Sequence, residues 1–114
     1  MLSLLIAVAL AQTSDQKAPT PEAGNIASLL SGDDYPAEAQ KSNFEGEVIL
    51  DLTITKEGRV RDCRVKQSSG YPILDDKTCA IMIERARFTP ARNSLGEPVE
   101  DVYRTPKIRW ALSK

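Results

Sequence analysis

The chain has 114 residues, which is enough for one domain with a small core. It contains no His, so the commonest general base and the commonest metal ligand are absent, and its two Cys cannot form a structural zinc site by themselves. Residues 35–114 hold 14 Lys and Arg against 12 Asp and Glu, and a charge of +2 does not by itself indicate nucleic-acid binding. We therefore predict no catalytic residues, no metal, no cofactor and no nucleic-acid partner.

The first eleven residues form an apolar run that ends in Ala-Leu-Ala. A helix needs about 20 apolar residues to span a bilayer, so residues 1–11 are too short for an anchor. Their length and small final residues are typical of a signal peptide cleaved after Ala11, which predicts export. No Lys or Arg precedes the run, so either it is a minimal signal peptide or the true start lies upstream; a buried strand or helix is the remaining alternative.

Residues 12–32 predict a flexible lead-in, because the polar stretch is interrupted at Pro19, Pro21, Gly24 and Gly32. Within it, residues 25–30 form a short apolar patch, which either docks on the domain as one helical turn or stays mobile. The globular domain is expected over residues 33–114.

A β-hairpin from Glu47 to Gln67 forms the centre of the predicted domain. Its first strand, residues 47–55, alternates strictly between two faces. The face that we expect to be buried carries Val48, Leu50, Leu52 and Ile54. A short loop then ends at Gly58, in a position where a hairpin turn often needs a positive φ.

Two helices are predicted to cover the hairpin. The first, over residues 33–41, has Pro36 at its first position, where a missing N–H costs nothing. The second is capped by Asp75, and its apolar stripe follows the spacing i, i+3, i+4, i+7. That stripe consists of Cys79, Met82, Ile83 and Ala86. Basic residues close this helix, and Phe88 beyond it is expected to fill the core.

The second strand of the hairpin brings Cys63 and Val65 onto one face, while Val60 is out of phase with them. This predicts either a β-bulge near residues 61–62 or a Val60 turned outward near the turn. If the second helix lies on the hairpin, Cys79 faces the same interior as Cys63. In an exported protein we therefore predict a disulfide, worth roughly 3 kcal/mol, with two buried thiols as the alternative.

The C-terminal part begins with a predicted loop over residues 89–101, which contain Pro and Gly. Residues 102–112 follow as a third half-buried strand, and its alternation places on the inner side Ile108, Trp110 and Leu112. Pro106 lies in this run and cannot donate to a ladder, so we expect the strand at a sheet edge.

Several short motifs follow one another through the globular part. They are Tyr35-Pro36, Gly46, Gly58-Arg59-Val60, Ser68-Ser69-Gly70, Leu74-Asp75, Arg87-Phe88-Thr89-Pro90-Ala91-Arg92 and Gly96-Glu97-Pro98-Val99. In this order they resemble the C-terminal domain of the TonB family over residues 33–112. The ordered set is specific, although no single motif would be. The placement of the two Cys also resembles that in a subset of the family.

The resemblance implies a small α+β fold, with a three-stranded antiparallel sheet and two short helices packed on one face. It also implies a periplasmic domain of a Gram-negative bacterium that takes part in TonB-dependent transmembrane transport. Such a domain binds the TonB box, a short extended segment of an outer-membrane receptor, as an added strand. A family energy transducer also has a membrane anchor and a long Pro-rich spacer. We expect inner-membrane anchorage here only if the true start lies upstream.

The candidate binding surface, by position on the last strand, consists of Tyr103, Arg104, Lys107 and Arg109. An ordinary solvated edge, at which cations discourage unwanted pairing, is the alternative. A second hypothesis is an envelope assembly module that pairs with itself through the same strand, without energy transduction. An enzyme is the least favoured class, because Asp51 fits the outward face of a strand and Asp75 and Asp76 fit a helix start.

Overall fold

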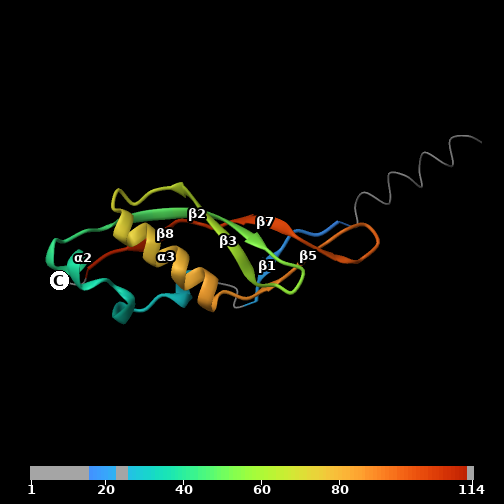
Figure 1. The fold of residues 1–114 in the computed structure, drawn as a ribbon, viewed down its shortest axis with the longest axis horizontal. Helices are drawn as coiled ribbons and strands as arrows, with labels where there is room; N and C mark the ends of the chain where they lie inside the picture. The colour runs from blue at the N-terminus through green and yellow to red at the C-terminus, as the bar shows by residue number, and fades with distance from the viewer. Residues whose placement is uncertain (1–15, 23–25, 113–114) are drawn as a thin grey trace, which may run out of the picture.

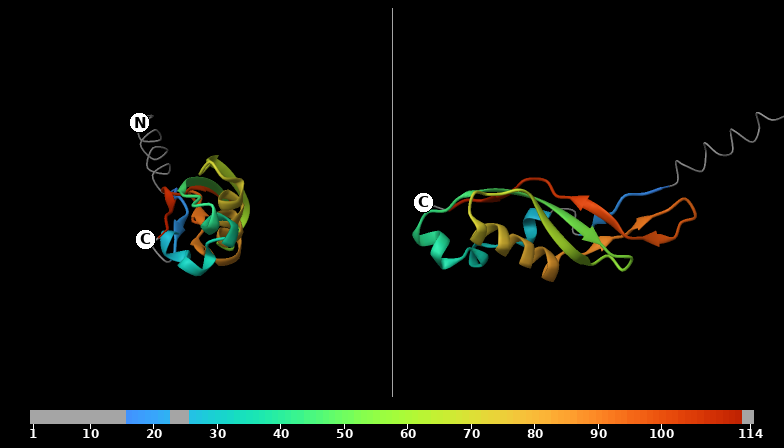
Figure 2. Two further views of the ribbon diagram at one scale, coloured as in Figure 1. Left: turned by 90° about the vertical axis from the view of Figure 1, so that its left-hand side faces the viewer. Right: turned by 45° about the horizontal axis from the view of Figure 1, so that its top comes forward.

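The computed structural model describes residues 16–22 and 26–112 (Figure 1). The predicted signal-like segment, residues 1–11, lies outside these ranges. Within them, no helix is long and apolar enough to cross a membrane. The fold is α+β, as predicted, with an antiparallel sheet and helices packed on one of its faces (Figures 1 and 2).

The central element is the predicted hairpin, made of β2 (Gly46–Ile54) and β3 (Val60–Gln67), which pair antiparallel. The side chains that we expected inside are fully buried: Val48, Leu50, Leu52 and Ile54. Thr53 pairs with Asp62 but Ile54 pairs with Val60, so Arg61 is the extra residue of a β-bulge. The bulge turns Val60 inward, where it is 5% exposed, and the alternative of an outward Val60 is wrong.

The predicted third strand is in fact two strands, β7 (Asp101–Arg104) and β8 (Ile108–Trp110), which both pair antiparallel with β2. Pro106 lies in the gap and has no N–H with which to continue the ladder. Thr105 bridges the gap, because its N–H donates to the carbonyl of Leu50 and its Oγ1 accepts from the N–H of Leu50. The strand order is β3–β2–β7, with β8 also beside β2, so the last strands form an edge as predicted.

The long helix α3 (Pro72–Arg85) starts earlier than predicted, since Tyr71 is its N-cap. Asp75 is therefore not the cap but a buried residue of the first turn, where its carboxylate accepts hydrogen bonds from the N–H and hydroxyl of Ser69. The predicted stripe is also partly wrong, because Ile83 is 43% exposed. The buried apolar and hydroxyl side chains of the helix are Leu74, Thr78, Ile81 and Met82. The apolar spacing indicates the wrong face because a polar residue, Thr78, holds one of the core positions.

The helix predicted over residues 33–41 is divided into a 3-10 turn, η2 (Gly32–Asp34), and α2 (Ala37–Lys41). Tyr35 separates them in an extended conformation, with ψ at 119°. A residue before proline avoids helical ψ, so Pro36 itself causes this break and is the N-cap of α2 instead of its first residue.

The described part of the predicted lead-in is held against the domain. β1 (Thr20–Pro21) pairs with β4 (Phe88–Thr89), and η1 (Ile26–Leu29) places Ile26 in the core, so the apolar patch docks as one helical turn. The predicted loop after α3 also contains a small hairpin of β5 (Ala91–Arg92) and β6 (Pro98–Val99). Strands of two residues are too short for hydrophobic alternation to reveal, which is why the sequence did not predict them.

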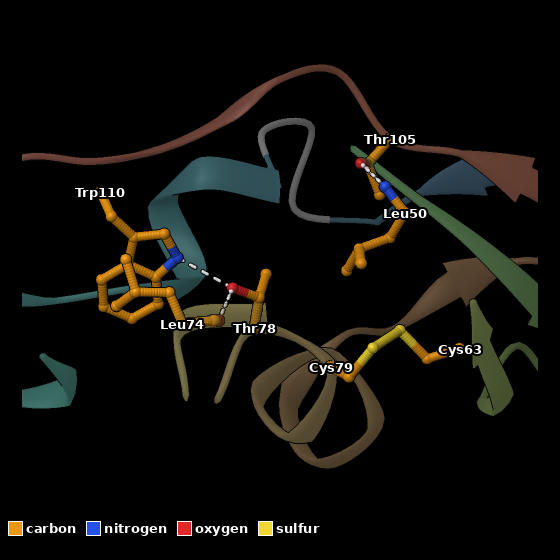
Figure 3. The surroundings of a disulfide bond; sticks show 7 residues. All are labelled: Leu50, Cys63, Leu74, Thr78, Cys79, Thr105 and Trp110. Carbon is orange, nitrogen blue, oxygen red and sulfur yellow. Dashed lines mark hydrogen bonds between the residues drawn. A yellow bond between two sulfur atoms is a disulfide. The ribbon is translucent and has the colours of Figure 1, made fainter. Parts of the chain in front are cut away.

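The core lies between the sheet and the helices, and Phe88 fills it as predicted, being 1% exposed. The Trp110 ring is also buried, and its Nε1 donates to Oγ1 of Thr78 at 2.8 Å (Figure 3). The predicted disulfide is present and joins Cys63 on β3 to Cys79 on α3, with their Cα atoms 5.8 Å apart (Figure 3). It therefore fastens the helix layer to one edge strand of the sheet.

Candidate functional site at the open sheet edge

The backbone direction of β7 determines which of its polar groups face away from the sheet. In an antiparallel pair, residues that bond to the neighbouring strand alternate with residues whose N–H and C=O point to the other side. The backbone N–H and C=O of Leu50 point towards the β7 side, because both form hydrogen bonds with Thr105 (Figure 3). By alternation, the N–H and C=O of Leu52 also point towards β7, where they face those of its partner Tyr103. The next residue of β7, Arg104, therefore has its N–H and C=O pointing outward. Among the described strands, none pairs with β7 on that side.

β8 continues the same edge beyond a bulge. Val48 pairs with Ile108, and Leu50 is hydrogen-bonded to Thr105. The two β2 residues are two positions apart, but their partners are three positions apart, so one extra residue bulges out around Pro106. Beyond the bulge the alternation along β2 continues, and the N–H and C=O of Arg109 point outward. The open edge therefore has two short pieces, at Arg104 and at Arg109, on either side of the bulge.

Tyr103 differs from the other residues of the predicted binding surface, because it lies on the core side of the sheet. It pairs with the buried Leu52, and its half-buried ring packs edge-on against Phe88, with the ring centroids 4.9 Å apart. Packing accounts for this residue, and the structure separates it from the three cations.

Arg104, Lys107 and Arg109 are all exposed along the edge. Arg104 donates to both carboxylate oxygens of Asp51, at 2.8 and 3.0 Å, and these hydrogen bonds hold the pKa of Asp51 below its usual value. Arg109 pairs in register with Glu47 on the outer face of the sheet, whereas Lys107 stands in the bulge. Each piece of outward-facing backbone thus has a cation beside it.

A shallow groove of about 190 Å³ lies on one side of β8. One side of this β8 groove is lined by Ala27, Leu30, Ser31 and Gly32, and we call residues 27–32 the groove wall. The other side is lined by Arg109, Trp110 and Ala111. Tyr35 also lines the groove, and its ring packs edge-on against Trp110, with the ring centroids 5.1 Å apart. The sequence did not predict the groove wall as part of a site, because the patch at residues 25–30 gave no indication of where it would dock.

This edge is suited to recognising a partner, because it combines outward-facing backbone donors and acceptors with exposed cations. Such an edge is the usual basis for adding an extended peptide to a sheet. In the described part of the chain, no three His, Cys, Asp or Glu side chains are grouped so that they could hold a metal ion.

The family model of the Gram-negative bacterial TonB protein C-terminal domain matches residues 32–112, which are 81 of the 114 residues. The chain therefore belongs to the TonB C-terminal domain family, and the resemblance over residues 33–112 is confirmed. The family is a non-catalytic domain of the Gram-negative periplasm that is associated with transport. A search of curated proteins finds no match to this sequence.

Proposed function

We propose that this TonB-like domain binds a TonB-box-type extended segment of an outer-membrane receptor in TonB-dependent transmembrane transport. The segment adds as a strand at the β7–β8 edge and pairs with the backbone of Arg104 and Arg109. The observation that carries the proposal is the alternation of β7 and β8 against β2, which directs these N–H and C=O groups away from the sheet.

Charge and groove shape support the same edge. Lys107 and Arg109 favour a segment that carries carboxylates on the outer face of the sheet, because complementary charges speed association and exclude wrong partners. The charge of Arg104 is already matched by Asp51. The β8 groove gives the added strand a second boundary beside the backbone. The disulfide is typical of an oxidising compartment, so it supports a periplasmic location.

A synthetic peptide with alternate N-methylation tests the proposal without altering the domain. The probe is a twelve-residue peptide that carries the TonB box of a TonB-dependent receptor, and its affinity is measured by calorimetry. In an added strand every second amide faces the domain, so methyl groups at one set of alternate positions abolish binding, whereas the intervening set leaves it nearly unchanged. Equal effects of the two sets, or no binding by the unmodified peptide, would contradict strand addition.

The alternative occupant of the edge is a second copy of the chain, as in an envelope assembly module without energy transduction. Val102 on β7 favours this candidate, because it is an apolar residue that is 55% exposed beside the open backbone. Sedimentation equilibrium without any peptide distinguishes the two functions. A dimer that forms with rising concentration and is dispersed by Val102→Lys supports self-pairing, whereas a monomer at all concentrations leaves the receptor segment as the occupant.

A further inference from the structure

The groove wall takes in most of η1 and the start of η2, and it lies between the core anchors Ile26 and Tyr35. Each turn is a short 3-10 piece, and pieces of this length close only one or two rings. A segment of this kind keeps a fixed shape when contacts from the rest of the fold hold it.

One side chain of α3 holds both turns at once. Arg85 Nη1 donates to the carbonyl of Leu29 at 3.0 Å, at the end of η1. The same Nη1 and Nη2 donate to the two carboxylate oxygens of Asp34, each at 2.8 Å, at the end of η2. Arg85 thereby connects the last residue of α3 to segments that are more than 50 positions away in the chain.

Asp34 receives these hydrogen bonds in a nearly buried position, since its side chain is 9% exposed. The N–H of Ser31, in the groove wall, also donates to its carboxylate at 2.8 Å. The hydrogen bonds from Arg85 and then from Ser31 hold the pKa of Asp34 far below its usual value. The carboxylate is thus a charged junction between α3 and the groove wall.

We propose that Arg85 is a positioning residue for the receptor segment: through Leu29 and Asp34 it fixes the groove wall beside β8 and so keeps the groove ready for an added strand. This inference rests on the proposed function. Arg85 does not line the groove, so it acts through the wall and not by touching the segment. If the released wall holds its present position about one tenth of the time, the affinity for the segment falls about tenfold.

The test compares Arg85→Met with a matched control, Arg61→Met. Arg61 makes a similar two-oxygen ion pair with Glu100, but this pair lies outside the groove. Amide hydrogen exchange and affinity for the same TonB-box peptide are measured on both variants. We expect Arg85→Met to speed exchange at the amides of Leu30 and Asp34 and to bind about tenfold more weakly. Arg61→Met is expected to change neither readout.

Two further variants keep the inference falsifiable if Arg85→Met fails to fold. Asp34→Asn removes the charged junction and is expected to lower affinity in the same direction. Arg85→Lys keeps the charge but cannot reach Leu29 and both oxygens of Asp34 together, so we expect an intermediate affinity. If Arg85→Met or Arg85→Lys binds the peptide with wild-type affinity, the positioning role is wrong while the proposed function still stands. Failure of the wild-type chain to bind the peptide would remove the proposed function, whatever the exchange rates of the wall.

Discussion

The two edges of the sheet have similar backbones and different surroundings. On β3, Cys63 pairs with Leu52 and Val65 pairs with Leu50, so the N–H and C=O of Cys63 and Val65 point outward. The same groups of Arg104 point outward on β7. Bulges interrupt both edges, at Arg61 and Lys66 on β3 and around Pro106 between β7 and β8. The β3 edge is fastened to α3 by the disulfide, whereas the β8 edge borders a groove.

This comparison shows that unpaired backbone groups alone do not define a strand-addition site. Both edges offer them, and bulges limit how long a strand either edge can accept. Both edges also carry exposed cations, so what distinguishes the β7–β8 edge is the groove wall beside it.

The largest effect is expected from Trp110→Ala, which removes the side chain that fixes β8 to the core. Trp110 is 3% exposed and also hydrogen-bonded to Thr78, so we expect a loss of about 3–5 kcal/mol in the free energy of unfolding. Urea denaturation followed by circular dichroism measures it. Trp110→Phe keeps most of the buried ring and should lose much less. An unchanged urea midpoint for Trp110→Ala would mean that β8 is not held in this way.

Removal of the disulfide tests how the β3 edge is fastened. Cys63 and Cys79 are 16 positions apart, and closing a loop of this length is worth about 3 kcal/mol in the chain-entropy model. The double variant Cys63→Ala, Cys79→Ala should therefore unfold at a lower urea concentration than the oxidised wild type. Reductant should lower the stability of the wild type but not that of the double variant. Equal stability of the oxidised and the reduced wild type would exclude a stabilising role for the disulfide.

Proline substitutions compare the two edges directly, because each removes one outward N–H. Arg109→Pro should weaken binding of the TonB-box peptide about tenfold more than Arg109→Ala, since only proline removes the backbone donor. Val65→Pro makes the same change at the β3 edge and should leave the affinity unchanged. Lys107→Pro, within the bulge, should have a smaller effect than Arg109→Pro. If Val65→Pro weakens binding as much as Arg109→Pro, the segment does not distinguish the edges.

The smallest effect is expected from the Arg104–Asp51 pair on the outer face. The pKa of Asp51 is lowered in the folded chain, chiefly by hydrogen bonds from Arg104, so its ionised form adds stability above the ordinary Asp pKa. This contribution is lost as the pH falls below about 4 towards the folded pKa. Asp51→Asn should show a slightly weaker acid dependence of the urea midpoint than the wild type. An identical pH profile would show that this exposed pair adds nothing measurable.

Hydrophobic alternation predicted β2 and its buried face, and the out-of-phase Val60 indicated the bulge at Arg61 as one of two alternatives. The same rule failed along the last strand. Strict alternation from the inward-facing Ile108 would point Tyr103 outward, but the extra residue around Pro106 reverses the phase and turns Tyr103 to the core. Thr105 bridges the strands with its hydroxyl, a role that no periodic pattern reveals.

The groove wall was also beyond prediction for a physical reason. Its position depends on Arg85 and Asp34, which meet across more than 50 positions of the chain and belong to elements that were predicted separately. Single-sequence patterns report which face of an element is apolar, and they do not report which distant carboxylate a helix-terminal Arg will reach. The sequence therefore predicts the binding residues by their strand, but it does not predict that the wall lies beside them.

Amide hydrogen exchange of the wild-type domain, with and without the unmodified TonB-box peptide, tests whether the segment is added at the β7–β8 edge. We expect the peptide to slow exchange at the amides of Arg104 and Arg109, the outward groups of the β7–β8 edge, while exchange at the amides of Cys63 and Val65 on the β3 edge stays unchanged. Protection confined to Cys63 and Val65, or bound peptide with no protection at either edge, would contradict strand addition at β7–β8.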